Sequence, residues 1–177
     1  GPGDIALLAR QGCHVVHCPA SNMKLASGIA PVTAYLGAGI NVALGTDGAA
    51  SNNRLDMFGE MRLASLLAKV SGGDAAALPA QAVLRMATIA GAKAIGFDDR
   101  IGSLEPGKEA DAIAVDFSAA ALAPCYDPVS HLVHAAGREH VTDVWVEGER
   151  LVAGGRFARL DAAAIAARAA LWRDRIA

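Results

Sequence analysis

The order in which short apolar runs and helical segments follow one another constrains this fold more than any other sequence feature. Residues 13–18 form a β-branched run bounded by a glycine and a proline, which is typical of a short buried strand. A loop of turn-forming residues (19–28) follows, then a helix over 31–38 and a second strand over 41–45. Strand, loop, helix and strand in this order predict a parallel α/β architecture.

The rest of the chain divides into two parts. A helix is predicted over 55–70, because its apolar residues recur at helical spacing along one stripe, Leu63, Leu66, Leu67 and Val70. Two further helices are expected, one from residue 79 and one over 88–95. The later elements are a strand over 110–116, a short helix over 128–135, a hairpin of 141–147 with 150–153, and a terminal helix over 162–176. We therefore predict an α/β part over 1–100 and a smaller β-rich part over 101–177.

Composition excludes several classes of protein. The chain has 177 residues, of which 53% are hydrophobic and 19% charged, so it has enough apolar material for a packed core. Its net charge of −2 is spread without blocks of like charge, which argues against nucleic acid or a membrane surface as partner. No apolar run reaches the roughly 20 residues of a membrane span. Three cysteines give no disulfide framework, which favours a cytoplasmic location.

The loop after the second predicted strand holds the strongest candidate for chemistry, Asp47. Parallel α/β folds place their reactive groups just past the carboxyl ends of strands, and Asp47 lies there. Strand alternation puts Val42 and Leu44 on one face, suited to packing on helices, and puts Asp47 on the opposite face with the small residues Ala43 and Gly45. A carboxylate here also fits a simple cap of a turn or helix. Spacing alone leaves both interpretations open.

The first predicted strand carries two histidines and two cysteines, which are the residue types that bind zinc. His14 and His17 are three residues apart, so on a strand they face opposite sides and cannot both reach one ion. We therefore expect Cys13, Cys18 and the histidines to pack in the strand. His17, being nearer the carboxyl end, could also line a pocket.

Other polar residues give weaker indications. His131 and His134 share a helical face without a complementary ligand pattern, so packing is the expected role. A second set lies in loops. Of these, Ser21, Asn22 and Lys24 either bind a ligand or satisfy the turn, whereas Glu105, Lys108 and Asp111 read as solvated turn charges. Glycine-rich phosphate motifs and a serine nucleophile elbow are missing from the sequence.

Three stretches in order resemble one known family. They are HCPASNMKLASGIAPV at 17–32, GTDGAASNN at 45–53 with EMRLASLL at 60–67, and IGSLEPGKEAD at 101–111. Together they resemble the amidohydrolase superfamily, in particular its 5-methylthioadenosine/S-adenosylhomocysteine deaminases and the related triazine and ammeline hydrolases. The first two stretches are specific in combination, whereas the third is common across the superfamily.

The resemblance implies a (β/α)₈ barrel with one divalent metal, usually Zn²⁺, and a small β-sandwich. Residues 1–100 would then be the C-terminal part of the barrel, with strands seven and eight, and residues 101–177 part of the sandwich. Such enzymes hold the metal with an HxH pair, a further histidine and an aspartate after strand eight. Only the aspartate has a counterpart in this chain, at Asp47, and its implied roles are metal ligand, substrate contact and proton shuttle.

The implied function is deamination of an adenosine-type substrate, 5-methylthioadenosine or S-adenosylhomocysteine, by metal-activated water with release of ammonia. The alternatives are a triazine or ammeline hydrolase, another purine deaminase, and a truncated relic or interaction module without catalysis. No HxH occurs in the sequence, so we expect the chain alone to be inactive. The expected partner is a small nucleoside-like molecule, and relatives suggest a homo-oligomer.

Overall fold

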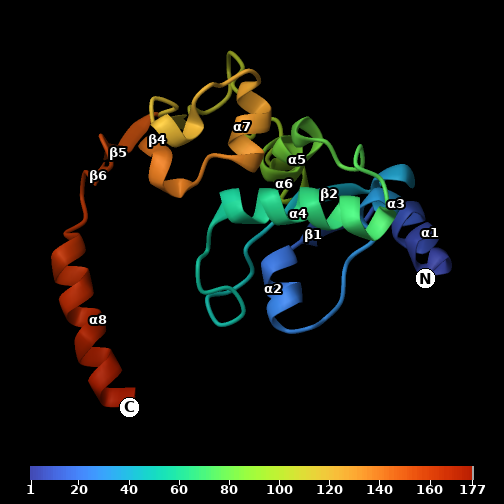
Figure 1. Cartoon of the computed structure of the whole chain (residues 1–177), viewed down its shortest axis with the longest axis horizontal. Coiled ribbons are helices and arrows are strands. Elements are labelled where there is room, and N and C mark those ends of the chain that lie inside the picture. Colours follow the sequence, from blue (N-terminus) through green and yellow to red (C-terminus); the bar gives the residue numbers. More distant parts are fainter. Residues whose placement is uncertain (177) are drawn as a thin grey trace.

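A computed structural model describes residues 1–176, and its first part contains a parallel pair of strands. The chain begins with α1 (Pro2–Arg10), β1 (His14–His17), α2 (Pro19–Lys24), α3 (Val32–Gly37) and β2 (Asn41–Leu44). β1 pairs with β2 in parallel, with Val15 opposite Val42 and Val16 opposite Ala43. This confirms the predicted order of strand, helix and strand (Figure 1).

The prediction of a loop over 19–28 is wrong for its first half, which forms α2. Pro19 occupies the first helical position, where its fixed φ angle suits a helix and its missing N–H costs nothing. The helix ends at Lys24, and the loops that follow β1 and β2 lie on the same side of the strand pair (Figure 1).

A long helix, α4 (Met57–Gly72), follows the second loop. Its start is fixed by Asp56, whose Oδ1 accepts hydrogen bonds from the Phe58 and Gly59 N–H groups. The predicted apolar stripe does not face the core, since Val70 is 80% exposed and Leu66 is also exposed. The buried face instead consists of Phe58, Glu60, Met61, Ala64, Ser65 and Ala68. Small side chains let this face approach its neighbours closely, and residue size outweighs hydropathy here.

The core lies between β2 and the helices that cover one of its faces. Of these helices, α4 and α5 (Ala80–Ala87) contact β2, α6 (Ile89–Ala94) contacts both strands, and α7 (Pro128–His134) packs on α4 and α5. Val42 and Leu44 belong to the core cluster, as strand alternation predicts. The cluster also contains Val32, Ile40, Phe58, Met61, Ala64, Ala68, Leu78, Val83, Met86, Val133 and Ala136.

The second part holds an antiparallel sheet of four strands. Its order is β3 (Ala112–Val115), β4 (Val141–Val146), β5 (Glu149–Ala153) and β6 (Arg156–Phe157), with short 3₁₀ turns at Ala120–Leu122 and Arg138–His140. The predicted strand and hairpin are therefore confirmed. Glu147 and Gly148, both at positive φ, make the tight turn between β4 and β5.

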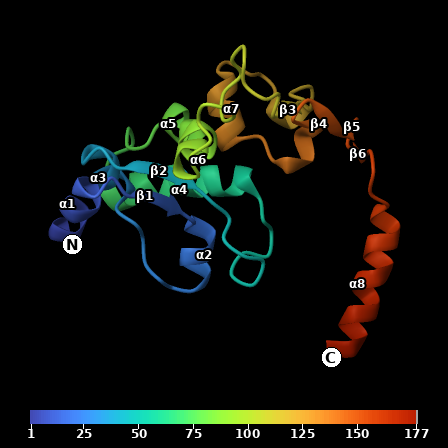
Figure 2. The same cartoon turned by 180° about the vertical axis from the view of Figure 1, so that it is seen from behind.

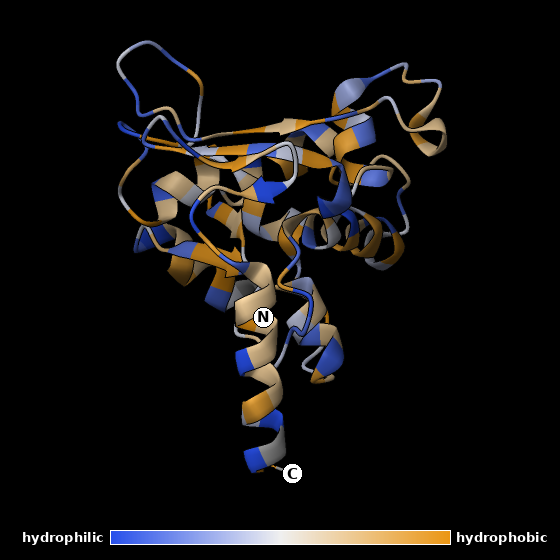
Figure 3. Ribbon diagram, turned by 90° about the vertical axis from the view of Figure 1, so that its left-hand side faces the viewer, coloured by the Kyte–Doolittle hydropathy of each residue, from blue (hydrophilic) through white to orange (hydrophobic). Residues whose placement is uncertain are grey.

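The last helix, α8 (Ala162–Ile176), extends away from the rest of the chain in both opposite views (Figures 1 and 2). Apolar and polar residues alternate along its surface (Figure 3). Ile165, Leu171 and Trp172 are all more than half exposed. Within the part of the chain that the structure describes, none of the helices combines the length and apolar character of a membrane span.

Candidate active site

Asp47 lies three residues beyond the end of β2 and is held by three hydrogen-bond donors. Its Oδ2 accepts from the Ser21 hydroxyl at 2.7 Å and from the Ser51 hydroxyl at 2.8 Å. Its Oδ1 accepts from the Gly48 N–H at 2.8 Å. These bonds, that of Ser21 first, lower the pKa of Asp47 below the ordinary value of an aspartate. Asp47 is therefore an exposed, ionised carboxylate at neutral pH.

The backbone at Asp47 is strained, because its φ of 59° lies in the left-handed region that non-glycine residues seldom adopt. Such conformations concentrate at functional sites. The helix cap in this region is Asp56 rather than Asp47. Asp47 does support a local turn through the Gly48 N–H, so the turn interpretation and a role in chemistry coexist at this residue.

A second carboxylate, Glu60, lies at the same end of the strand pair but inside the protein. It is only 2% exposed. Its Oε2 accepts from the Ala20 N–H at 3.0 Å, and its Oε1 accepts from the Asn52 amide at 2.7 Å. Burial raises the pKa of Glu60, while the two donors act against that rise. The same Asn52 amide also donates to the Thr46 carbonyl at 2.8 Å, directly before Asp47.

Sequence reasoning missed Glu60, Asn52 and Ser51. A signal for Glu60 does exist, since the residue lies four and eight positions before Ala64 and Ala68, on the face of α4 that turns inward. A charged residue within a buried helical face needs hydrogen-bond partners. No comparable signal exists for Asn52 and Ser51, which are two of many polar residues in a loop.

The loop after β1 is attached to the loop after β2 by further contacts. The Lys24 ammonium donates to the Ala50 carbonyl at 2.8 Å and to the Asn53 side-chain oxygen at 2.7 Å. Asn22 contributes a backbone hydrogen bond to Cys18. For Ser21 and Lys24, the structure thus shows contacts between loops, and Ser21 reaches Asp47 itself.

The two histidines of β1 lie on opposite faces, as their spacing predicts. His17 is 3% exposed, and burial lowers its pKa; its Nδ1 finds no hydrogen-bond partner among the described residues. His14 is exposed, with its Nδ1 2.8 Å from the Asn41 amide nitrogen. Cys13 and Cys18 are partly buried and free, and burial, with the charges of Asp47 and Glu60, raises the pKa of Cys18.

Of the two α7 histidines, His131 packs in the structure, whereas His134 is exposed. His131 Nε2 lies 2.9 Å from the Leu122 carbonyl oxygen, and its ring contacts that of Phe117. Burial, followed by the charges of Lys69 and Arg62, lowers the pKa of His134.

The prediction of solvated turn charges is wrong for Lys108. The Lys108 side chain is only 13% exposed and donates to the Asp98 carbonyl and the Ser103 hydroxyl. Asp111 Oδ1 accepts from the Glu147 N–H at 2.8 Å. Glu105 is exposed as predicted. The turn folds back over the lysine stem, so its backbone supplies acceptors that the sequence pattern does not reveal.

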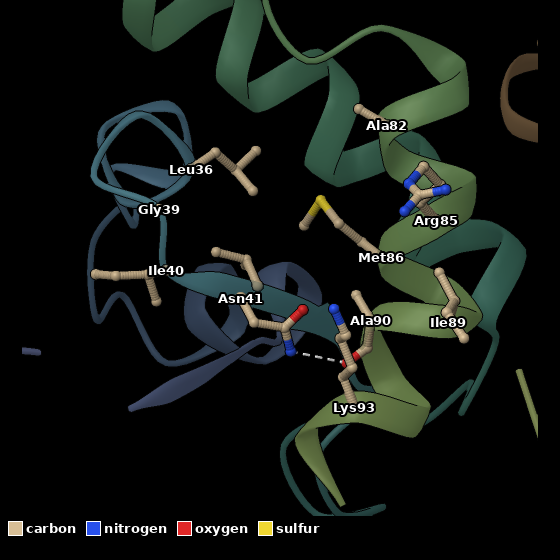
Figure 4. Close-up of a pocket in the computed structure, with 11 residues that line it drawn as sticks. Leu36, Gly39, Ile40, Asn41, Ala82, Arg85, Met86, Ile89, Ala90 and Lys93 are labelled. Carbon is tan, nitrogen blue, oxygen red and sulfur yellow. Dashed lines mark hydrogen bonds between the residues drawn. The ribbon is translucent and has the colours of Figure 1, made fainter. Parts of the chain in front are cut away.

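A cavity of about 360 Å³ opens at the other end of β2 (Figure 4). Leu36, Ile40 and Met86 form apolar walls, and Arg85 and Lys93 also line it. The Asn41 amide donates to the Ala90 carbonyl at 2.9 Å, so its donor is already occupied (Figure 4). This cavity surrounds the amino end of the strand and is separate from Asp47.

Residues 1–176 contain no group of three or more His, Cys, Asp or Glu side chains that could hold a metal ion. Zinc sites need at least three protein ligands. Asp47 fits as one ligand of such a set, because it is ionised, exposed and open on one side. A carboxylate offers about four lone-pair sites, and the three donors leave one of them free, on Oδ1.

The fold and the site define an α/β protein with polar groups at the carboxyl ends of parallel strands. Comparison with known proteins is more specific. The amidohydrolase family model matches residues 2–151, so the chain belongs to the amidohydrolase family.

Several curated relatives are similar over nearly the whole chain. The 5-methylthioadenosine/S-adenosylhomocysteine deaminase of Teredinibacter turnerae is 55% identical over 173 residues, which are 98% of this chain and 39% of the relative. The protein of the same name from Halobacterium salinarum is 52% identical over 95% of this chain and 38% of its own length. The chain thus spans about two fifths of the relatives that it matches.

Solved structures agree with this placement. A zinc-bound adenosine deaminase from Xanthomonas campestris superposes with a TM-score of 0.97 at 51% identity, covering 99% of this chain and 40% of the other. The zinc complex of atrazine chlorohydrolase TrzN from Arthrobacter aurescens gives 0.89 at 31% identity, covering 95% and 37%. The fold prediction is therefore confirmed at the level of a mixed α/β chain that matches amidohydrolase structures.

Proposed function

We propose that residues 1–100 form the last two strands and helices of a (β/α)₈ hydrolase barrel, and that residues 101–177 form part of a small β-sandwich. In the described residues β1 pairs with β2 alone, which leaves its other edge without a strand. Val16, on the face opposite the core, is more than half exposed. An unpaired strand edge beside an exposed apolar residue fits a sheet that continues in the complete protein.

The complete protein is, in this proposal, a metal-dependent deaminase of 5-methylthioadenosine or S-adenosylhomocysteine. The observation that carries it is the ionised Asp47 carboxylate at the end of β2, with one lone-pair site free. The names of relatives more than 50% identical support the substrate class. A divalent metal, zinc in the solved relatives, would supply the charge that lowers the pKa of a water molecule.

Asp47 contributes two properties to such a reaction. It is in the basic form at neutral pH, so it can accept the proton of the attacking water, although its lowered pKa makes it a weaker base than an ordinary aspartate. Ser21 and Ser51 occupy Oδ2 and the Gly48 N–H takes one site on Oδ1, so the one site that could receive a cation or a proton lies on Oδ1. The proton held there is then available to the departing amino group, which leaves as ammonia.

A triazine hydrolase is the second candidate, because the TrzN structure superposes over 95% of this chain. The two candidates differ in the bond that breaks: carbon to amino nitrogen in the deaminase, carbon to chlorine in the chlorohydrolase. A non-catalytic relic is the third, since the described residues hold no complete metal site.

A substrate panel with metal analysis tests these candidates in the complete protein. The expected result is about one zinc per chain and release of ammonia from methylthioadenosine and adenosylhomocysteine in preference to guanine. Chloride release from atrazine, with no ammonia from either nucleoside, would favour the triazine hydrolase. A protein without bound metal and without turnover would contradict both enzymatic candidates. The homo-oligomer and the cytoplasmic location stay predictions.

A further inference from the structure

We propose that Glu60 is a positioning residue for Asp47, acting through the two segments that hold the Asp47 carboxylate, α2 and the loop after β2; this rests on the proposed function. Glu60 makes no contact with Asp47 itself. Its two hydrogen bonds end on the residues next to the two serines that do.

The first connection runs through the start of α2. Glu60 Oε2 accepts from the Ala20 N–H at 3.0 Å. The next residue, Ser21, donates its hydroxyl to Asp47 Oδ2 at 2.7 Å. Since Ala20 and Ser21 are neighbours in the first turn of α2, holding the Ala20 N–H restrains the backbone from which the Ser21 hydroxyl projects.

The second connection runs through the loop after β2. Glu60 Oε1 accepts from the Asn52 amide at 2.7 Å, and that amide also holds the Thr46 carbonyl. The preceding residue, Ser51, donates its hydroxyl to the same Oδ2 of Asp47 at 2.8 Å. Hydrogen bonds therefore connect Glu60 to Asp47 Oδ2 through two independent segments. Asp47 Oδ1 keeps the one lone-pair site that no donor occupies.

The burial of Glu60 indicates that this arrangement is specific. An ionised carboxylate that is 2% exposed is costly unless donors satisfy it, and within residues 1–176 no salt bridge reaches Glu60. Both of its partners are N–H donors, so each needs an acceptor. An amide at this position would turn its own NH₂ group against one of them, which leaves that donor without an acceptor.

Ser65 offers a matched control on the same helix. It is fully buried like Glu60, and its hydroxyl donates to a backbone group, the Leu78 carbonyl, at 3.1 Å. That contact fixes the connection between α4 and α5, away from Asp47. Replacing Ser65 therefore tests general stability without touching either connection.

The test compares wild type, Glu60→Gln and Ser65→Ala in the complete enzyme, with zinc affinity from chelator competition, melting temperature, kcat and KM. We expect Glu60→Gln to weaken zinc binding about 10- to 100-fold, which is the usual effect of losing a group that orients a metal ligand. The variant should lower kcat by a larger factor than it changes KM. Ser65→Ala should lower the melting temperature and leave zinc affinity within about twofold of wild type.

Two results would overturn the inference: unchanged zinc affinity in folded Glu60→Gln, or equal losses of zinc affinity in Glu60→Gln and Ser65→Ala. If Glu60→Gln does not fold, Asn52→Ala removes the second connection together with the Asn52 hydrogen bond to the Thr46 carbonyl, and it should still weaken zinc binding; wild-type affinity in that variant contradicts the inference. A wild-type enzyme that binds no zinc would instead contradict the proposed function.

Discussion

The loop after β2 and the first turns of α4 each bring one carboxylate to the same end of the strand pair, in opposite surroundings. Asp47 is exposed, and hydrogen bonds from Ser21, Gly48 and Ser51 lower its pKa. Glu60 is buried, and burial raises its pKa. Asp47 keeps a free lone-pair site, whereas one oxygen of Glu60 accepts from α2 and the other from the loop after β2. The contrast shows that two acidic side chains at one end of the strand pair differ in role: Asp47 is open to a ligand, whereas Glu60 holds the surrounding segments in place.

The largest effect is expected at the exposed carboxylate. Asp47→Asn in the complete enzyme should lower kcat/KM by about 10³-fold or more, because the amide cannot accept a proton at neutral pH. The melting temperature should change little, since asparagine tolerates positive φ. Ammonia release and thermal denaturation measure the two quantities, and near-normal turnover would remove Asp47 from the reaction.

The buried carboxylate should show the reverse balance. Glu60→Ala leaves the Ala20 N–H and the Asn52 amide without an acceptor and opens a cavity, so the free energy of unfolding should fall by about 2–4 kcal/mol. Urea denaturation of the complete enzyme measures this, with Asp47→Ala as the control at the exposed site. Equal losses in the two variants would contradict the division between support and reactivity.

A smaller effect is expected from the hydroxyl that contributes most to the lowered pKa of Asp47. Ser21→Ala removes that donor, so the pKa of Asp47 should rise toward its ordinary value. Asp47 acts as the carboxylate, so the acidic limb of the kcat/KM profile should move to higher pH. In the wild type, the stability that Asp47 adds is present above its unfolded-state pKa and is lost as pH falls through the lower folded-state pKa. In Ser21→Ala the folded-state pKa is higher, so this stability should be lost at a higher pH.

Ser27→Ala, an exposed substitution in the loop that follows α2, is the control for this profile. An acidic limb that lies at the same pH in Ser21→Ala and Ser27→Ala would show that the Ser21 hydroxyl does not set the protonation of Asp47.

The smallest effect is expected at Lys24. Lys24→Met removes two exposed hydrogen bonds between the loops, which should cost no more than about 1 kcal/mol. Amide hydrogen exchange in residues 49–53 should nevertheless become faster. Lys93→Met, at the other end of the strand pair, is the control. Equally fast exchange of residues 49–53 in Lys93→Met would mean that the effect does not come from the two hydrogen bonds of Lys24.

Much of this arrangement follows from sequence patterns because the patterns are local. Strand alternation predicts that Val42 and Leu44 face the core, and the structure confirms it. The same alternation directs attention to Asp47. The proposed role of Asp47 in metal binding comes from family resemblance rather than from spacing, and it stays a proposal.

What escaped prediction depends on contacts between distant segments. Hydropathy places Leu66 and Val70 on the buried face of α4, whereas the structure buries Glu60, Ala64 and Ser65 instead. On that buried face, Glu60 accepts hydrogen bonds from residues 8 and 40 positions away in the chain. A helical periodicity cannot contain that information, because it describes one segment at a time.

The left-handed backbone at Asp47 also has a meaning for descendants of this protein. Glycine and asparagine adopt a φ of 59° more readily than aspartate does. In a lineage released from the need for turnover, drift should therefore replace the aspartate early with one of these two residues, although glycine would give up the hydrogen bonds that the carboxylate accepts. A natural variant that keeps aspartate at position 47 would therefore indicate that the chemistry of this residue is still under selection.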